Sequence, residues 1–125
     1  MDRIHPTSDD EHRLLALWAA DCAAHVLPVF EQENADDRPR KAIEAARAWV
    51  RGDLPMTTAR KHAFAAHAAA REAVNANAIA AARSAGHAAA TAHVASHAQY
   101  AASYALKASA DSKLEKVWQM ERCPR

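Results

Sequence analysis

Residues 86–108, GHAAATAHVASHAQYAASYALKA, decide the fold of this chain. Alanine dominates the stretch, which also holds three histidines and two tyrosines: His87, His93, His97, Tyr100 and Tyr104. Alanine has the highest helix propensity of all residues, and its single methyl group lets neighbouring helices approach closely. We therefore expect closely packed helices, with these histidines and tyrosines as the main large groups at their contacts.

The composition of the whole chain supports the same fold class. The 125 residues include 35 alanines but only two glycines, which is too few for a loop-rich β fold. No stretch alternates convincingly between apolar and polar residues, as strands of a half-buried sheet do. The sequence predicts an all-α fold: a compact single-domain bundle of five to six antiparallel helices with an alanine-rich core. The domain spans residues 1–125, with residues 1–8 and 123–125 as flexible ends.

Capping patterns and proline positions predict where the helices begin and end. Ser8, Ser96 and Ser112 each precede Glu or Gln by three residues, which is typical of a capping box. One of the threonines at 57–58 caps the third helix, and Pro28 kinks the first helix or splits off its last turn. The predicted helices cover residues 8–32, 39–51, 57–74, 78–94 and 96–110, and a short final helix begins at Ser112. Whether residues 78–110 form one helix or two is left open.

Helical spacing assigns the larger apolar side chains to buried faces. Gly86 lies in the interior of a predicted helix, where glycine lowers helix stability by about 1 kcal/mol relative to alanine. We interpret it as a point where another backbone crosses, so Gly86→Leu is expected to destabilise the fold. The predicted buried stripes hold Leu14, Leu17, Trp18, Phe64, Val74, Leu114, Val117, Trp118 and Met120.

Charge and cysteine content exclude several classes of protein. Sixteen basic and fifteen acidic residues give a net charge of +1, which disfavours binding to nucleic acid. The polar start of the chain predicts no signal peptide, and charged residues interrupt the alanine tracts, which predicts no membrane span. Cys22 and Cys123 are too few for a disulfide framework. We expect a cytoplasmic bacterial protein.

Polar side chains recur beside the apolar stripes. Asp21 and His25 lie one helical turn apart and can pair directly, while His67 and Arg71 border the stripe of the third helix. Because the seams of a bundle converge, we expect some of these polar groups to meet beside one pocket. The candidate residues for binding a ligand or partner are Asp21, His25, His67, Arg71, His87, His93, His97, Tyr100 and Tyr104.

Three roles remain open for the histidines. On one continuous helix, His93 and His97 would face the same way, so that they and His87 are weak candidates for a metal site. Alternatively, the histidines fill space and form hydrogen bonds between helices. Asp21 and His25 would be the acid–base pair of an enzyme. The chain has no nucleophile motif and no phosphate-binding glycine loop, so we expect neither catalysis nor a cofactor.

Arginines and tryptophans have both structural and binding interpretations. Arginines often bridge helices by pairing with carboxylates, and Glu44 is spaced to reach Arg40 or Arg47. The arginines that are also suited to binding an anion are Arg38, Arg40, Arg47, Arg60, Arg71 and Arg83. Trp18, Trp49 and Trp118 are expected either in the core or as anchors for a partner.

Four stretches of the sequence resemble a known family. They are LWAADCAAHVLPVFE (residues 17–31), DDRPRKAIEAARAWVRG (36–52), ARKHAFAAHAAAREA (59–73) and AGHAAATAHVASHAQYAASYALKA (85–108). Together they resemble the bacterial immunity proteins with the Imm-five-like domain of polymorphic toxin systems. The resemblance implies a non-enzymatic inhibitor that neutralises a cognate toxin domain by binding it. It assigns no residue a role and leaves a homodimer open.

The alternative function comes from the histidines alone. It is a small-ligand or metal-binding helical domain, including an enzyme, that uses His87, His93 and His97. Since the net charge is only +1, the toxin reading favours a partner that is not a basic nuclease, or a contact set by local rather than global charge.

Overall fold

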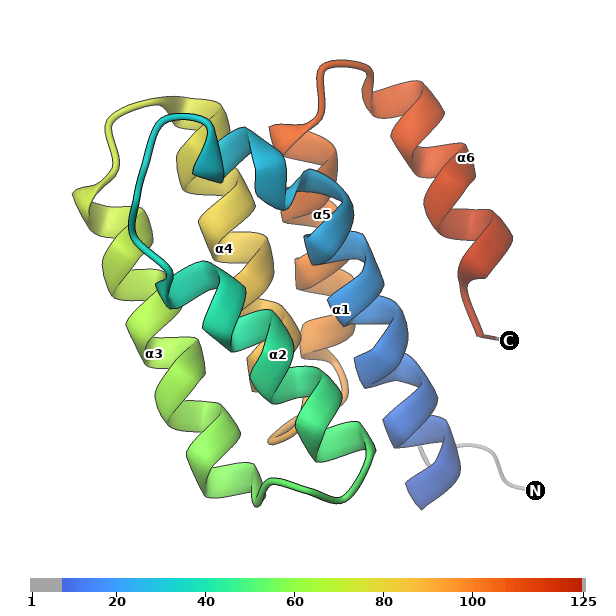
Figure 1. Cartoon of the computed structure of the whole chain (residues 1–125). Helices are drawn as coiled ribbons and strands as arrows, with labels where there is room; N and C mark the ends of the chain where they lie inside the picture. Colours follow the sequence, from blue (N-terminus) through green and yellow to red (C-terminus); the bar gives the residue numbers. More distant parts are fainter. Residues whose placement is uncertain (1–7, 125) are drawn as a thin grey trace.

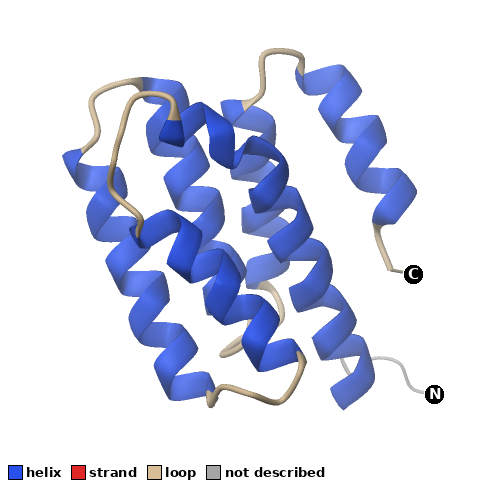
Figure 2. Cartoon of the chain, in the orientation of Figure 1, coloured by secondary structure: helices blue, strands red, loops and turns tan. Residues whose placement is uncertain are grey.

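The computed structural model describes residues 8–124, and this part of the chain contains six helices and no strand. Successive helices run in opposite directions and are joined by short loops (Figures 1 and 2). The predicted all-α fold of antiparallel helices is confirmed. The predicted flexibility of residues 1–7 and of residue 125 lies outside the described residues. The helices are α1 (Asp9–Glu31), α2 (Arg38–Val50), α3 (Met56–Glu72), α4 (Ala76–Ala90), α5 (His97–Ala108) and α6 (Ser112–Arg122).

The helix ends confirm one predicted capping box and correct the others. Ser8 caps α1 with the complete reciprocal box, and α1 continues through Pro28 instead of splitting. The threonines at 57–58 cap nothing, because α3 begins one residue earlier, after Pro55. Ser96 makes no side-chain cap bond to α5, and the cap of α6 is Asp111 instead of Ser112. Asparagine and aspartate are strong caps, and Asn75 plays this role at α4.

Residues 78–110 form two helices. α4 ends at Ala90, and a turn precedes the start of α5 at His97. His12 at the start of α1 lies against this turn, where its Nε2 is 2.6 Å from the carbonyl oxygen of Thr91. The end of α2 is held in a similar way, since Arg13 donates hydrogen bonds from Nη1 to the carbonyl oxygens of Trp49 and Val50. The first two turns of α1 thus hold the ends of two other helices.

The core is built mainly from alanine. α4 packs against α1, α2, α3 and α5, so it lies at the centre of the bundle. Ala85, Ala88 and Ala89 of α4 are completely buried, and Phe30 is the largest fully buried side chain. Small side chains fill most of the interior, so only a few larger apolar side chains are buried with them. Among the side chains predicted to be buried, those of Leu14, Leu17, Phe64, Val74, Leu114, Val117 and Met120 are exposed, which corrects the prediction.

α6 lies at the edge of the bundle (Figure 1), and polar contacts hold it there. Trp18 of α1 donates a 2.9 Å hydrogen bond from Nε1 to the carbonyl oxygen of Gln119. Gln119 in turn donates from Nε2 to the carbonyl oxygen of Ala102 on α5, also at 2.9 Å. The exposed Leu114, Val117 and Met120 contribute little to this packing. Specific hydrogen bonds, more than apolar burial, therefore position α6.

One helix has the length and composition of a possible membrane span, although the sequence predicts no such span. α1 has an 18-residue window with a mean hydropathy of 1.4, enough by length and composition to cross a membrane. Because 44% of that window is buried inside the bundle and α1 packs against α2, α4 and α5, its apolar character is accounted for by the core. Such length and composition are weak evidence for a membrane span.

Candidate functional site

Three of the predicted histidines meet where α3, α4 and α5 pack together. His67 comes from α3, His87 from α4 and His97 from α5, and we call this group the histidine cluster. The imidazole rings of His67 and His87 meet edge to face, with centroids 4.8 Å apart. The rings of His87 and His97 lie 5.1 Å apart. The cluster is confined to one side of α4, the central helix.

Gly86 makes room for the cluster. A Cβ atom at this position would lie 2.7 Å from both Cε1 and Nε2 of His67, a distance that side-chain carbons do not tolerate. The group that crosses Gly86 is therefore an imidazole ring and not a second backbone, which corrects the prediction. Arg83, one turn earlier on α4, donates a 3.0 Å hydrogen bond from Nη1 to Nδ1 of His67. The arginine fixes the ring on the glycine and leaves the proton of the neutral ring on Nε2.

His87 is the central residue of the cluster. Its Nδ1 lies 2.9 Å from Nδ1 of His97, so one ring donates a hydrogen bond and the other accepts it. The ring of Tyr104 lies nearly parallel to that of His87, at 7° and 5.4 Å between centroids. The ring of Tyr100, one turn before Tyr104 on α5, also lies 5.4 Å from that of His87 between centroids. Because most neighbouring residues are alanines, the rings of His87, His97 and the two tyrosines pack mainly against one another.

The surroundings of the cluster keep its imidazoles neutral. Burial lowers the pKa of His67 to about 4, and the charges of Arg83 and Arg71 act in the same direction. Burial likewise lowers the pKa of His87 to about 4, with further effects from His67, His97 and Arg83. Burial and nearby His93 also hold the pKa of His97 below its usual range. At pH 7, His67 and His87 are therefore uncharged groups between cations.

The remaining predicted residues divide between the rim of the cluster and another site. Arg71 and His93 are exposed but close enough to lower the pKa values of His67 and His97, so they lie at the rim. Asp21 and His25 lie elsewhere, along an open cleft of about 340 Å³ between α1, α2 and α6. Some of the predicted polar groups therefore meet in the histidine cluster, whereas Asp21 and His25 lie at a separate site. The cleft is lined by Asp21, Ala24, His25, Arg47, Trp118 and Arg122.

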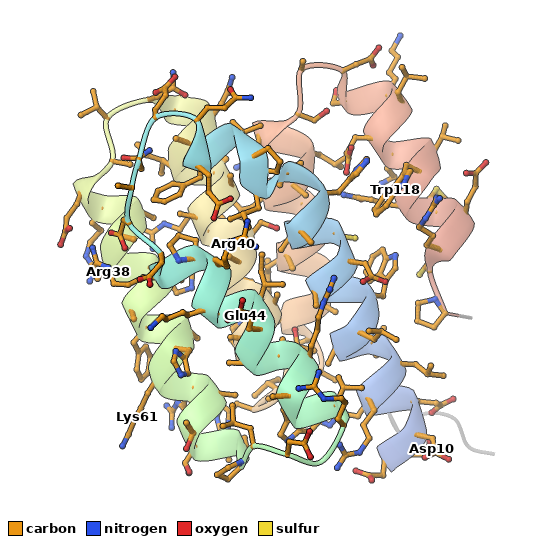
Figure 3. All side chains as sticks on the ribbon, in the orientation of Figure 1. Asp10, Arg38, Arg40, Glu44, Lys61 and Trp118 are labelled. Carbon is orange, nitrogen blue, oxygen red and sulfur yellow. The ribbon has the colours of Figure 1, made fainter. Side chains whose placement is uncertain are left out.

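Asp21 and His25 each pair with another residue, so the predicted pair between them is wrong. Asp21 accepts a 2.9 Å hydrogen bond from Nη2 of Arg47 on α2. His25 Nδ1 lies 2.9 Å from the Oε2 atom of Glu115, a carboxylate only 6% exposed on α6. The imidazole also stacks on Trp118 at 3.8 Å between centroids, and Trp118 lies between α6 and α1 in Figure 3. These contacts join helices, and Asp21 and His25 are not paired with each other.

The arginines of α2 mostly bridge helices, but not through Glu44. Arg40 binds Glu31 of α1 through two hydrogen bonds of 2.8 and 2.6 Å, and Arg47 is occupied by Asp21. Arg40 and Glu44 lie one turn apart on α2 in Figure 3, yet no ion pair joins them within the described residues. The predicted pairing is wrong because both guanidinium groups instead bind carboxylates of α1.

In the part of the chain that the structure describes, the histidines are not grouped as a metal site. The predicted clasp needs His93 and His97 on one continuous helix, but His93 lies in the turn between α4 and α5. Within residues 8–124 no three side chains of His, Cys, Asp or Glu are grouped to hold a metal ion. His87 and His97 instead satisfy each other through a direct hydrogen bond.

Aromatic and basic side chains continue outward from the cluster along α3 and α5. The guanidinium of Arg60 lies 5.4 Å from the ring centroid of Phe64, and the Lys107 ammonium lies 5.0 Å from that of Tyr104. We call this surface the histidine face. It comprises Arg60, Phe64, His67 and Arg71 of α3, Arg83 and His87 of α4, and His97, Tyr100, Tyr104 and Lys107 of α5.

Part of the histidine face was not predicted from the sequence. Phe64 had been assigned to the core, whereas its side chain is 59% exposed. Arg60 and Arg83 were considered only as helix-bridging or anion-binding arginines, and Lys107 was not considered. One signal was available: residues 56–108 contain five lysines and arginines but a single acidic residue, Glu72. The whole-chain charge of +1 conceals this asymmetry.

The histidine cluster predicts how stability depends on pH. An unfolded histidine titrates near pH 6.5, whereas folded His67 and His87 titrate near pH 4. Between these values the unfolded chain binds more protons, so the free energy of unfolding falls as the pH is lowered. From pH 7 to 4.5 we expect a loss of about 1–2 kcal/mol for each imidazole, measured by urea denaturation.

Single-residue variants separate this effect from the protonation of carboxylates. His67→Gln and His87→Gln should each flatten the pH dependence, whatever they do to stability at pH 7. His62→Gln is the matched control, since His62 lies on α3 but outside the cluster. An unchanged slope in both cluster variants would show that these imidazoles are not held neutral by the fold.

Comparison with known proteins identifies a family. A family model described as "Imm-5 like putative immunity protein" matches residues 5–125. No curated protein and no solved structure matches the chain. The match covers both the histidine face and the cleft, so it does not by itself distinguish between them.

Proposed function

The chain belongs to the Imm-5 like family of immunity proteins, and on this basis we propose that it neutralises a cognate bacterial toxin by binding the toxin domain, without catalysing a reaction. The observation that carries the proposal is the histidine face. It presents Phe64 and Tyr100, which are 59% and 53% exposed, around a centre of half-buried rings. A rigid aromatic surface of this kind suits a protein contact.

The composition of the histidine face supports this role. Tyrosine and arginine are enriched among the residues that contribute most to binding energy in protein interfaces. Tyr100, Arg60 and Arg71 are exposed around the cluster, while Tyr104 is half-buried within it. Because His67 and His87 are fixed by hydrogen bonds before any partner arrives, little conformational entropy is lost on binding.

A catalytic role is less well supported by the same contacts. The Nδ1 atom of His67 already accepts a hydrogen bond from Arg83. A pKa of about 4 makes His67 and His87 weak bases at pH 7, where a general base works best with a pKa near the operating pH. Asp21 and His25 do not form the acid–base pair that an enzyme would use.

Co-expression tests the proposed function. We expect the adjacent gene to encode a large secreted protein that ends in a toxic domain. Expressing that domain alone in bacteria should stop growth, and adding this chain should restore it, with the two proteins co-purifying as a complex. Equal growth arrest with and without this chain would contradict the proposal. The cytoplasmic location expected from the sequence stays a prediction.

A further inference from the structure

The positive charges of the protein are distributed unevenly between its two sides. In α1 and α2 most basic side chains have carboxylate partners: Arg13 pairs with Asp9, Arg40 with Glu31, Lys41 with Asp37 and Arg47 with Asp21. These ion pairs neutralise the side of the bundle formed by the first two helices.

The histidine face has no such neutralisation. Glu72 is the single acidic residue of residues 56–108, and it binds Arg38 of α2 at 2.6 Å. Within residues 8–124 no carboxylate pairs with Arg60, Arg71, Arg83 or Lys107, whereas each of these cations lies on or beside a ring of the same face. The face therefore carries four positive charges and no negative charge of its own.

We propose that the histidine face binds an acidic protein surface, with carboxylates of the partner meeting Arg60, Arg71, Arg83 and Lys107. This inference rests on the proposed function and names the chemistry of the toxin surface that the face receives. Charge complementarity of this kind steers association and selects among partners. The uncharged rings between the cations supply the apolar contact. More than half of the surface of Phe64 and of Tyr100 is exposed and would be buried by the partner.

The arrangement favours a protein over a nucleic acid. Binding to a phosphate backbone draws its affinity from many lysines and arginines that neutralise successive phosphates. Here only four cations are present, spread over three helices and separated by neutral imidazoles and tyrosines. An acidic protein patch can place individual carboxylates to match such a pattern.

Charge reversal at the rim tests this inference. Arg60→Glu is suitable because Arg60 is exposed, lies in the first half of α3 and makes no contact that holds the cluster together. Lys41→Glu is the matched control: it is an exposed helical position with the same change of charge, but on α2. Arg71→Gln provides a second, milder change on the histidine face.

The expected results concern the toxin domain encoded by the adjacent gene. Arg60→Glu should weaken its binding about tenfold and Arg71→Gln severalfold, whereas Lys41→Glu should stay within twofold of the wild type. For the wild-type protein the association rate should fall as NaCl rises from 50 to 300 mM, because salt screens the steering charges. Arg60→Glu should reduce that salt dependence.

Other outcomes distinguish failure of the acidic contact from failure of the proposed function. If Arg60→Glu and Lys41→Glu change affinity equally, or neither changes it, an acidic contact at this face is wrong while toxin binding stands. If the wild type binds no toxin domain, the proposed function itself fails. A labelled 20-nucleotide poly(dT) strand tests the nucleic-acid reading: tight binding at 150 mM NaCl that Arg60→Glu removes would overturn the proposal.

Discussion

Replacing Gly86 by leucine will lower the free energy of unfolding by about 3 kcal/mol, at the upper end of the range for overpacked interiors. Gly86 is buried, and even a Cβ atom there would lie 2.7 Å from the imidazole of His67. That ring does not move aside freely, because Arg83 holds its Nδ1 atom and His87 packs against it. Urea denaturation at pH 7 measures the loss.

A double-mutant cycle tests whether the ring of His67 causes the destabilisation by a side chain at position 86. Gly86→Ala adds only a methyl group, and in a helix this change alone is favourable by about 1 kcal/mol. In the wild type it should nevertheless destabilise, because the methyl group displaces the His67 ring. In a His67→Ala background the same change should become stabilising, since the ring is gone. Stabilisation in both backgrounds would show that the ring does not constrain position 86.

Replacing His25 by alanine will destabilise the docking of α6 by about 2 kcal/mol. The change leaves the carboxylate of Glu115, which is only 6% exposed, without its partner, and removes the ring that stacks on Trp118. A buried charge that loses its partner costs several kcal/mol, and the 41% exposure of His25 reduces that figure here. Few other contacts hold α6, so the effect should appear as local opening.

Hydrogen exchange and a second substitution distinguish this mechanism from general instability. Amide protons of α6 should exchange faster in His25→Ala, with those of α4 almost unchanged. His25→Ala combined with Glu115→Leu should recover most of the loss, because no unpaired charge then remains. His93→Ala, at an exposed histidine in a turn, is the control. Equal exchange rates for α6 in wild type and His25→Ala would contradict the account.

The fold could be predicted from local signals in the sequence. Helix propensity and spacing depend on near neighbours, so the alanine-rich stretches and the box at Ser8 gave the correct elements. The cap of α6 was misplaced because Asp111 and Ser112 are adjacent residues and both suit the position. The exposure of Phe64 and Leu114 was missed because alanine already fills the interior, so apolar character does not identify buried residues here.

The candidate site was only partly predictable, for a related reason. His67, His87 and His97 stood out because little else in these helices is large and polar, and the structure brings them together. Partners from distant helices leave no local pattern, so neither Glu115 beside His25 nor Arg83 beside His67 could be inferred. Spacing along one helix shows which residues share a face but not which helix lies opposite.

The most direct test of the central claim uses the imidazole protons of the eight histidines as reporters in NMR spectra. Single His→Gln variants assign the resonances, and the toxin domain is then added to the wild-type protein. We predict that the resonances of His67, His87 and His97 shift, whereas those of His12, beside Thr91, and His25, beside Glu115, stay in place. Shifts confined to His12 or His25, with the histidine cluster unaffected, would contradict the claim that the toxin binds the histidine face.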